Sequence, residues 1–475
     1  MTLDSPFFNS IALDENSKTP LYVQLYQIIY TAITTGQLAP GYKLPPIRKL
    51  AKKIGINPGT IVNAYRELAQ NGYIFSREGS GSIVAERLIQ SELPPEEFPA
   101  VFDYSNAELP PQYKNCINMR SITLNPEIVS TAEFKKAVQK ILERDEAYTF
   151  CADSATGYHG LRESLSAALT DDGIKTTPES IQIISGSQQG IDIIARTILS
   201  HGDHVITESP TYPGALAAFR AVGARVIGIP LTKSGIDIAA FEKQLKLLHP
   251  KLIYVMPNLQ NPTGITYDTE TRSRLIGLAR YYDTYVLEDD YLSGLYYASV
   301  PPQPLKALDT NDHVIYLRSF SPVFMPGLRL AFIVAPQKLI NQLSKRKKLV
   351  DLSSSGLTQK VLDLYLREGI WPKHLANIRH AYEMRFAFTC KQAKQILSSQ
   401  FKWQKPTGGL SLWLELPNNT SAHSLTEKAE ANDLLITDGG EFFPNNNPDK
   451  FIRLSFANLT PAKIEAGLTI LNKLL

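Results

Sequence analysis

The apolar residues near the start of the chain recur with the spacing of three short helices. In residues 21–33 they return every three or four positions, which is one face of a helix, and the pattern stops at Gly36. Residues 44–54 repeat the pattern. They begin with a proline pair that favours the first helical turn, and Gly55 ends this helix. Residues 57–68 form the third helix. Two helices joined by a short glycine turn predict a helix-turn-helix.

A glycine-containing hairpin pattern follows the third helix. Residues 72–74 and 79–84 are short runs around a polar turn, which predicts a two-stranded wing whose glycines let the backbone approach a groove or a phosphate. Between residues 43 and 77 the only acid is Glu67, whereas the basic residues are Lys43, Arg48, Lys49, Lys52, Lys53, Arg66 and Arg77. Because the net charge of the whole chain is only +3, this local patch, and not a bulk excess, would attract nucleic-acid phosphates.

Residues 19–87 closely resemble the GntR family of winged-helix transcription regulators. The resemblance rests on Leu44, Pro45, Arg48, Leu50, Ala51, Asn57, Pro58, Gly59, Thr60, Ala64, Tyr65, Leu68, Gly72, Gly79, Ser80 and Gly81. It implies a double-stranded DNA operator as the partner. The residues implied to contact DNA are Arg48, Asn57, Gly59, Thr60, Asn63 and, at the wing tip, Gly81.

One residue departs from the GntR pattern. Pro46 stands where the family more often has a serine that bonds a phosphate, so one contact is expected to be missing. The alternative interpretation of the whole segment is a small helical domain with a solvated basic face.

The chain is expected to have four parts. Residues 1–18 form an N-terminal tail without the features of a signal peptide, and residues 19–87 form the DNA-binding domain. Residues 88–117 hold five prolines and five acids without a helical period, which indicates a linker. Residues 118–475 form an effector domain whose small C-terminal subdomain starts at about residue 351.

Beyond the linker, helical patterns alternate with short β-rich runs. These runs are residues 181–184, 204–207, 252–256, 285–287, 314–317 and 330–334. Such alternation predicts an α/β fold with a mainly parallel sheet wrapped by helices. In folds of this class the ligand lies beyond the carboxyl ends of the strands.

Polar residues suited to a phosphate and to a charged ring follow several of these strands. Residues 185–190 begin a helix after the first strand, and a helix N-terminus binds phosphate well. Tyr212 comes just past the second strand, and Asn261 lies in a turn made rigid by proline. Asp289 ends another strand within a run of acids, and a buried acid requires a cationic partner such as a protonated heterocycle. Singly, each residue has an ordinary alternative, such as a core-edge aromatic or a plain turn.

Read in order, these residues resemble the fold-type I aminotransferase family, and the fusion resembles the MocR-like subgroup of GntR regulators. The resemblance covers residues 19–475 and implies pyridoxal phosphate, a large mixed sheet domain and a smaller C-terminal α+β domain. The residues implied to hold the cofactor are Ser187, Gln188, Ser319, Ser321 and Arg329 at the phosphate, Tyr212 on the ring, Asn261 and Tyr291 at the ring hydroxyl, and Asp289 at the ring nitrogen. Arg453 matches the arginine that binds a substrate carboxylate, a bidentate contact for which arginine is suited.

One position breaks the aminotransferase pattern. In the family the lysine that forms a Schiff base with the cofactor lies seven residues before the equivalent of Arg329, and here that residue is Pro322. The motifs on both sides fit without a gap, so no catalytic residue is assigned. Losing the lysine removes the covalent anchor and the general acid/base of transamination together. Lys345, Lys347 and Lys348 lie in a charged run that we expect to be a solvated helix face and not a replacement.

Three functions stay open. The first is a regulator whose pocket binds pyridoxal phosphate, its amine form or a preformed amino-acid adduct without a covalent bond. The second is a regulator whose pocket has drifted to another anionic ligand and keeps Arg329 and Arg453. The third is an active pyridoxal-phosphate-dependent aminotransferase with an accessory DNA-binding domain. The retained Tyr212 and Asp289 favour the first function over the second, and Pro322 argues against the third.

The remaining expectations concern the setting of the protein. The resemblance implies a homodimer, because fold-type I sites are built at a subunit interface, and two DNA readers would engage repeated half-sites. A small-molecule effector would bias the placement of the winged helices through the linker. Cys116, Cys151 and Cys390 show neither a disulfide framework nor metal-site spacing, which indicates a reducing cytoplasm. No run of eighteen apolar residues occurs, so no membrane span is expected.

Overall fold

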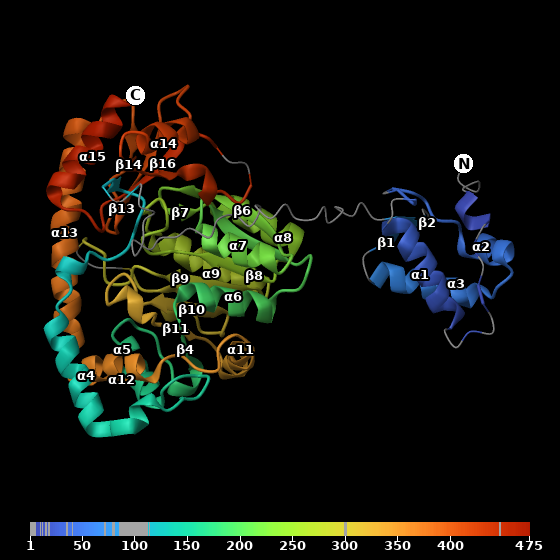
Figure 1. Cartoon of the computed structure of the whole chain (residues 1–475), viewed down its shortest axis with the longest axis horizontal. Helices are drawn as coiled ribbons and strands as arrows, with labels where there is room; N and C mark the ends of the chain where they lie inside the picture. Colours follow the sequence, from blue (N-terminus) through green and yellow to red (C-terminus); the bar gives the residue numbers. More distant parts are fainter. Residues whose placement is uncertain are drawn as a thin grey trace. The chain divides into compact units, whose positions relative to one another are not determined.

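The chain folds into two compact units, Met1–Pro99 and Ala100–Leu475 (Figure 1). The computed structural model describes residues 6–9, 11, 13–14, 17, 20–34, 37–39, 41–70, 73–77, 81–84, 113, 115–298, 302–445 and 448–475. The predicted wing-tip residues 79–80, Gly72 and nearly all of the predicted linker lie outside these described residues.

The first unit is a three-helix domain with a two-stranded wing. Its elements are η1 (Pro6–Asn9), α1 (Leu21–Thr34), α2 (Ile47–Ile54), α3 (Pro58–Gln70), β1 (Ile74–Arg77) and β2 (Gly81–Val84). The two strands pair antiparallel, and the amide of Leu44 donates to the carbonyl of Ser82 at 2.8 Å, which joins the wing to the segment before α2. The predicted helix-turn-helix and wing are therefore confirmed.

Three local features hold the helices of the first unit together. Gly55 ends α2 at φ +74°, a left-handed conformation that glycine adopts without strain, and its amide donates to the carbonyl of Ala51 at 3.0 Å. The buried hydroxyl of Tyr65 donates to the carbonyl of Pro45 at 3.0 Å and fixes α3 against the start of α2. Phe8, which lies in the predicted N-terminal tail, is only 2% exposed and packs in the same core.

The second unit is built on an eight-stranded sheet. In spatial order the strands are β4 (Ile181–Ile184), β11 (Ala331–Val334), β10 (Val314–Ser319), β9 (Tyr285–Asp290), β8 (Leu252–Val255), β5 (His204–Ser209), β6 (Arg225–Thr232) and β7 (Gly235–Ile236). The five strands from β10 to β6 run parallel, whereas β4, β11 and β7 pair antiparallel with their neighbours. The predicted mixed, mainly parallel sheet is confirmed, and β6 is a strand that the sequence pattern did not reveal.

Helices cover both faces of this sheet. They are η3 (Pro126–Ile128), α4 (Thr131–Asp145), η4 (Glu146–Phe150), α5 (His159–Leu169), η5 (Pro178–Ser180), α6 (Ser187–Ile198), α7 (Pro213–Ala221), α8 (Ile238–Leu248), α9 (Thr269–Tyr281), α10 (Leu305–Leu308), η6 (Pro326–Leu328), α11 (Gln337–Val350) and α12 (Gly356–Arg367). Along β8, Tyr254 packs with α6, α7 and α11, whereas Ile253 and Val255 pack with α8 and α9 on the other face. This alternation is the period of a strand buried on both sides.

A smaller group of elements closes the second unit. It contains β3 (Ile117–Asn118), α13 (Ile370–Ile396), β12 (Lys402–Trp403), β13 (Ser411–Glu415), α14 (Ala422–Glu430), β14 (Leu434–Leu435), β15 (Thr437–Asp438), η7 (Gly439–Phe442), β16 (Phe451–Ser455) and α15 (Pro461–Lys473). Its core draws on residues from Phe386 onward together with Met119, while α12 packs with α4 and α5 under the large sheet. The predicted subdomain boundary near residue 351 stays a prediction.

Within the described part of the chain, no helix combines the length and the apolar character that crossing a membrane requires.

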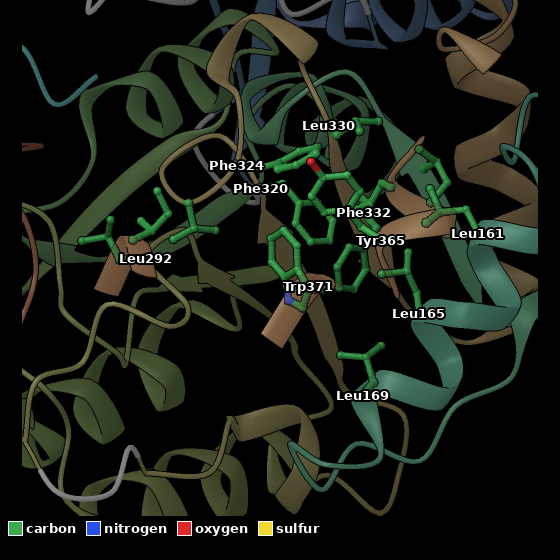
Figure 2. Packing of buried hydrophobic residues seen from close by; sticks show 14 of the residues in the cluster. Leu161, Leu165, Leu169, Leu292, Phe320, Phe324, Leu330, Phe332, Tyr365 and Trp371 are labelled. Carbon is green, nitrogen blue, oxygen red and sulfur yellow. The ribbon is translucent and has the colours of Figure 1, made fainter. Parts of the chain in front are cut away.

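An aromatic cluster under β10 and β11 anchors the loop that carries Pro322. Figure 2 shows Phe320, Phe324 and Trp371 gathered in this cluster. The Phe324 ring is 1% exposed and lies 5.2 Å from the ring of Tyr365 and 5.7 Å from that of Trp371, measured between centroids. The loop is therefore held in place by its apolar side chains.

We expect Phe324→Ala to lower the free energy of unfolding by about 3–5 kcal/mol, because the variant loses a buried ring and leaves a cavity. Equilibrium urea unfolding of the full chain measures this. The control is Tyr281→Ala, at a ring that is 80% exposed, and it should cost about 0.5 kcal/mol or less. A loss below about 1 kcal/mol for Phe324→Ala would contradict this account of the loop.

Candidate functional site

A candidate phosphate site lies where residues 185–187 meet Arg329. The first turn of α6 begins at Ser187, and the first turn of a helix presents backbone N–H groups without helical acceptors. Gly186 precedes it at φ +99°, and a Cβ atom there would lie 2.2 Å from Nη2 of Arg329. Only glycine leaves room for the guanidinium to lie against the backbone at this point.

The hydrogen bonds of Arg329 connect two loops around this point. Its guanidinium donates at 3.5 Å to the carbonyl of Ser185 and at 3.5 Å to Oγ of Ser321. The amide of Ser321 donates in turn to Oγ of Ser319 at 3.2 Å. Both bonds of Arg329 are long and have neutral acceptors, so a phosphate oxygen would form stronger ones. The structure thus gathers four of the predicted phosphate ligands, Ser187, Ser319, Ser321 and Arg329, around Gly186.

Gln188 and the two predicted tyrosines lie on the same side of the sheet. The Nε2 atom of Gln188 donates to the carbonyl of Gly214 at 2.8 Å, which ties α6 to the start of α7 just after Tyr212. Its Oε1 atom is buried and has no hydrogen-bond partner among the described residues. Tyr212 and Tyr291 are half-buried and pack against the cluster beneath α6 and α7.

Asp289, the residue predicted to meet a ring nitrogen, is a buried carboxyl at the carboxyl end of β9. The hydroxyl of Tyr254 donates to its Oδ2 at 2.8 Å, whereas Oδ1 is buried without a partner in the described part of the chain. Burial raises the pKa of Asp289 to about 7, the Tyr254 bond opposes this, and the negative charges of Asp290 and Glu208 add to the rise. Asp289 therefore has one acceptor oxygen without a donor, and a cation next to it would stabilise its ionised form.

The three other carboxyls buried beside Asp289 are committed to the fold. Glu208 accepts from the amide of Met256, from Tyr267 and from Gln260, at 2.6–3.0 Å. Glu288 accepts from the amides of Leu305 and Lys306 at 2.7 and 2.8 Å and so caps α10. Asp290 accepts from Tyr316 at 2.7 Å and lies near the positive charge of Arg318, although its Oδ1, like that of Asp289, is buried without a hydrogen-bond partner in the described residues. Of this group, Asp289 is the acid with neither a cation nor a full set of donors in the described residues.

Arg453 and Asn261 meet between the large sheet and the small one. The Arg453 side chain is fully buried and donates from Nη1 to Oδ1 of Asn261 at 3.2 Å. Its Nη2 donates to the carbonyl of Arg120 at 3.1 Å and to Oγ1 of Thr437 at 3.4 Å, and the guanidinium carbon lies 5.0 Å from the centroid of the Phe442 ring. The structure therefore places the predicted carboxylate ligand next to the predicted ring-hydroxyl ligand. No motif in the sequence pointed to Arg120 or Thr437 as neighbours of this arginine.

The loop around Pro322 keeps its shape without a lysine. The amides of Val323 and Phe324 both donate to the carbonyl of Phe320, at 3.1 and 2.7 Å, so the turn does not need an N–H group at residue 322. Proline carries no amine, and the residue that would attach the cofactor is absent from its expected place.

One prediction about the nearby lysines is wrong. Lys345 and Lys348 are exposed as expected, but Lys347 is fully buried and forms an ion pair with Asp351. The inner face of α11 is formed by Leu339, Ile340 and Leu343, and Lys347 continues this stripe, so the helical period turns it inward. Asp351 also accepts from Gln189 at 2.8 Å and from Ser185 at 3.3 Å. The ion pair thus supports the phosphate loop, and its ammonium is engaged by a carboxylate.

The residues predicted to contact DNA share an accessible surface of the first unit. Arg48 on α2 is exposed, as are Asn57, Gly59 and Asn63 at the start of α3 and Gly81 at the start of β2, while Thr60 is half-buried. Oδ1 of Asn57 accepts from the amide of Gly59 at 2.8 Å and so shapes the first turn of α3. The neighbouring Lys43, Lys49, Lys52 and Arg66 are exposed too, which gives this surface its positive charge. The individual DNA contacts stay predictions.

Two cavities of the second unit lie outside the predicted cofactor residues. One, of about 1090 Å³, is lined by α5, the loop after it, Arg318 and the start of α13. The other, of about 730 Å³, lies against Trp403, Trp413, Phe443 and Phe451. Neither contains a predicted cofactor ligand, and Arg329 is exposed. We call the predicted cofactor residues the cradle; its phosphate end at Arg329 is open to solvent in one chain, whereas Asp289 is buried.

Comparison with protein families matches both units. A family model described as aminotransferase class I and II matches residues 121–471, and one described as bacterial regulatory proteins, gntR family, matches residues 21–84.

Similar proteins fall into two groups. An HTH-type transcriptional regulator of Bacillus subtilis, YdfD, is 27% identical over 95% of both chains, and the probable rhizopine catabolism regulatory protein MocR of Rhizobium meliloti is 26% identical over 97% of this chain and 95% of its own. Among solved structures, an α-aminoadipate aminotransferase from Thermus thermophilus, complexed with N-(5′-phosphopyridoxyl)-L-leucine, is 30% identical with a TM-score of 0.72. The match covers 76% of this chain and 92% of that one.

Asp289→Asn is expected to stabilise the protein at alkaline pH. Because burial raises the pKa of Asp289 to about 7, the folded state holds a proton that the unfolded chain has lost, so stability falls as pH rises from about 4 through 7. The uncharged variant avoids this loss. We expect its free energy of unfolding to exceed that of the wild type by about 1–3 kcal/mol at pH 8, with the difference shrinking toward pH 5.

Urea unfolding of the ligand-free protein at the two pH values measures this difference. The control Asp283→Asn changes a side chain that is 98% exposed and should alter the free energy by less than about 0.5 kcal/mol at either pH. An Asp289→Asn effect of the same size at both pH values would show that the carboxyl is not protonated in the folded state.

Proposed function

Because the chain belongs to the class I and II aminotransferase family and joins that domain to a GntR-type DNA-binding domain, as a MocR-type regulator does, we propose that it is a transcription regulator whose second unit senses a small ligand. The ligand is pyridoxal phosphate, its amine form or an amino-acid adduct, held without a covalent bond. Ligand binding changes how the winged helices meet an operator.

The observation that carries this proposal is the spare buried oxygen of Asp289. A carboxyl in this position costs stability unless a cation meets it, and a protonated pyridine nitrogen is such a cation. Tyr212 and Tyr291 pack against the apolar cluster beneath α6 and α7. Arg329, which lies against Gly186, provides the phosphate end of the cradle. The residues present fit pyridoxal phosphate, which supplies an aldehyde that condenses with amines. In this chain Ser187, Ser319, Ser321 and Arg329 would hold its phosphate, Asn261 and Tyr291 its ring hydroxyl, and Asp289 its ring nitrogen.

Transamination is not part of the proposal. The proton transfer of that reaction needs an amine beside the substrate carbon, and Pro322 offers none. Lys347 is buried in an ion pair with Asp351, so it is held away from such a task. A pocket that has drifted to another anionic ligand is the second candidate function. An anionic ligand would account for the two arginines, Arg329 and Arg453, but it would not account for the buried oxygen of Asp289 that lacks a hydrogen-bond partner.

We propose that the regulator works as a homodimer in the cytoplasm. Large exposed apolar side chains lie within or next to residues 349–356 and in the segment beside Gly356; they are Leu349, Val350, Leu352, Tyr148 and Phe150. Exposed apolar surface of this kind marks an interaction site. Ser354 and Asp351 bond to Ser185, so the surface borders the phosphate loop, and a second copy of the chain there would close the open cradle.

Added pyridoxal phosphate should give the wild-type protein a visible absorption band that dialysis removes and that borohydride does not fix to the chain. Pro322→Lys should convert this into a band that borohydride fixes permanently, because it restores an amine at the residue where the family resemblance places the lysine. Absorption spectra and intact mass after treatment measure both. A borohydride-stable adduct on the wild type would show that another lysine takes over.

Gly186→Ala tests whether the ligand that produces the absorption band is bound at the predicted phosphate site. Its Cβ would displace the Arg329 guanidinium, so we expect affinity for pyridoxal phosphate to fall by about tenfold or more, the loss of one charge-assisted contact. Unchanged affinity would place the ligand elsewhere. No band in any protein would favour the drifted pocket.

Arg48→Ala should weaken binding to a DNA fragment from the protein's own promoter region and reduce the slope of log K against log salt by about 1, because one phosphate contact is lost. Fluorescence titration at several salt concentrations measures this and also the number of chains bound, for which we expect two. Arg280→Ala, an exposed arginine of the second unit, is the matched control. Equal slopes for the Arg48 variant and the wild type would remove Arg48 from the interface.

A further inference from the structure

The cavity of about 730 Å³ in the second unit has one wall that is made of aromatic rings. We call it the aromatic cavity, and this wall consists of Trp403, Trp413, Phe443 and Phe451, which are all half-buried. The rings of Trp413 and Phe451 stack 5.2 Å apart with 13° between their planes, and the ring of Phe443 lies 5.7 Å from that of Phe451 at 26°. A wall of flat faces at these distances suits another flat ring, which can stack on it.

The opposite wall of the aromatic cavity belongs to the large sheet and its loops. This wall consists of residues 209–210 and 230–233 together with Thr263 and Ile265. Two hydrogen bonds fix the segment that carries Phe443 to the large sheet. The amide of Thr211 donates to the carbonyl of Phe442 at 2.7 Å, and Nη2 of Arg220 donates to the carbonyl of Pro444 at 2.7 Å. The cavity is therefore preformed, and its volume lies in the range of small-molecule sites, roughly 300–1,000 Å³.

The rim of the aromatic cavity carries positive charge on both walls. Lys233, in the turn between β6 and β7, and Lys402 on β12 are exposed, and neither forms an ion pair with another residue that the structure describes. The acid in the lining is Glu415, which pairs with Lys450 at 3.0 Å. Because the acid has its own partner, the two rim lysines remain to attract an anionic group on a ligand.

We propose that the aromatic cavity is a second ligand site, separate from the cradle, and that it binds a flat aromatic carboxylate. The ring of the ligand stacks on the tryptophan wall, and Lys233 and Lys402 hold the carboxylate at the rim. A saturated ring fills the same space without stacking, and a neutral aromatic molecule lacks the attraction to the lysines, so both bind less tightly. This site goes beyond the proposed function, because it requires neither pyridoxal phosphate nor the cradle.

Fluorine NMR of the full chain labelled with 5-fluorotryptophan tests the site, because two of the three tryptophans line the cavity. Single Trp→Phe variants assign the three signals. We expect indole-3-acetate to shift the signals of Trp403 and Trp413 and to leave that of Trp371, which lies in the cluster of Figure 2, unchanged. Tryptophol keeps the indole ring without the carboxylate, and cyclohexylacetate keeps the carboxylate without a flat ring. Each should bind about fivefold or more weakly than indole-3-acetate.

A pair of double lysine variants tests the rim. Lys233→Gln with Lys402→Gln should remove the preference for indole-3-acetate over tryptophol, because the affinity for the anion falls and that for the neutral ring does not. The matched control is Lys391→Gln with Lys394→Gln, which changes two exposed lysines of α13 and should keep the preference. An unchanged preference in the rim variant would overturn the proposal, and so would equal binding of the three probes to the wild type.

Competition with pyridoxal phosphate separates the aromatic cavity from the cradle. Saturating pyridoxal phosphate should change the affinity for indole-3-acetate by less than twofold, and so should Gly186→Ala, which alters the phosphate end of the cradle. Displacement of indole-3-acetate by pyridoxal phosphate, or probe shifts that are absent at Trp403 and Trp413, would overturn the proposal. If indole-3-acetate shifts these two signals and pyridoxal phosphate gives no absorption band, the aromatic cavity stands and the proposed function is wrong.

Discussion

The second unit depends on how it manages the acids buried at the carboxyl ends of its parallel strands. Parallel strands bring their carboxyl ends to one edge of the sheet, so Glu208 at the end of β5 and residues 288–290 at the end of β9 are forced close together in a low-dielectric interior. Glu208 and Glu288 offset the cost of burial by bonding loops and a helix cap, which turns them into braces for the residues around the site. Asp289 is left with a free oxygen. Asp290 also keeps an unpartnered oxygen but lies near the positive charge of Arg318, so within this group of acids Asp289 alone combines an unpartnered oxygen with the lack of a nearby cation.

The sequence predicted the parts of the fold whose pattern is local. The three helices and the wing of the first unit follow from apolar period and glycine position, and six strands of the large sheet follow from short β-rich runs. The strand β6 was missed because glycine and proline interrupt it, and seven of its eight residues are half-buried or exposed, so it lacks a continuous buried apolar run. Phe8 was missed because a single aromatic pair, Phe7 and Phe8, has no periodic pattern that shows which core it packs into.

The candidate site shows the same division. The residues of the cradle are recognisable from the sequence because each lies within a fixed motif, and Pro322 is recognisable as a break in one. Their supports are not, since Tyr254, Asp351 and Arg120 come from distant segments that only the fold brings together. Lys347 is the instructive case. The helical period of α11 places Lys347 on the same buried face as Leu339, Ile340 and Leu343. The charged residues next to it in the sequence led to the wrong prediction that it is exposed.

The loss of the lysine changes what Arg453 can contribute. In a transaminase the binding energy of a carboxylate orients a substrate for a reaction, but without an amine at residue 322 that energy has no chemical step to serve. It remains available to change the conformation of the chain, by as much as the ligand binds one arrangement more tightly than the other. Arg453 itself is fully buried and bonded to Asn261, Arg120 and Thr437, so the fold holds its guanidinium in place before any ligand arrives.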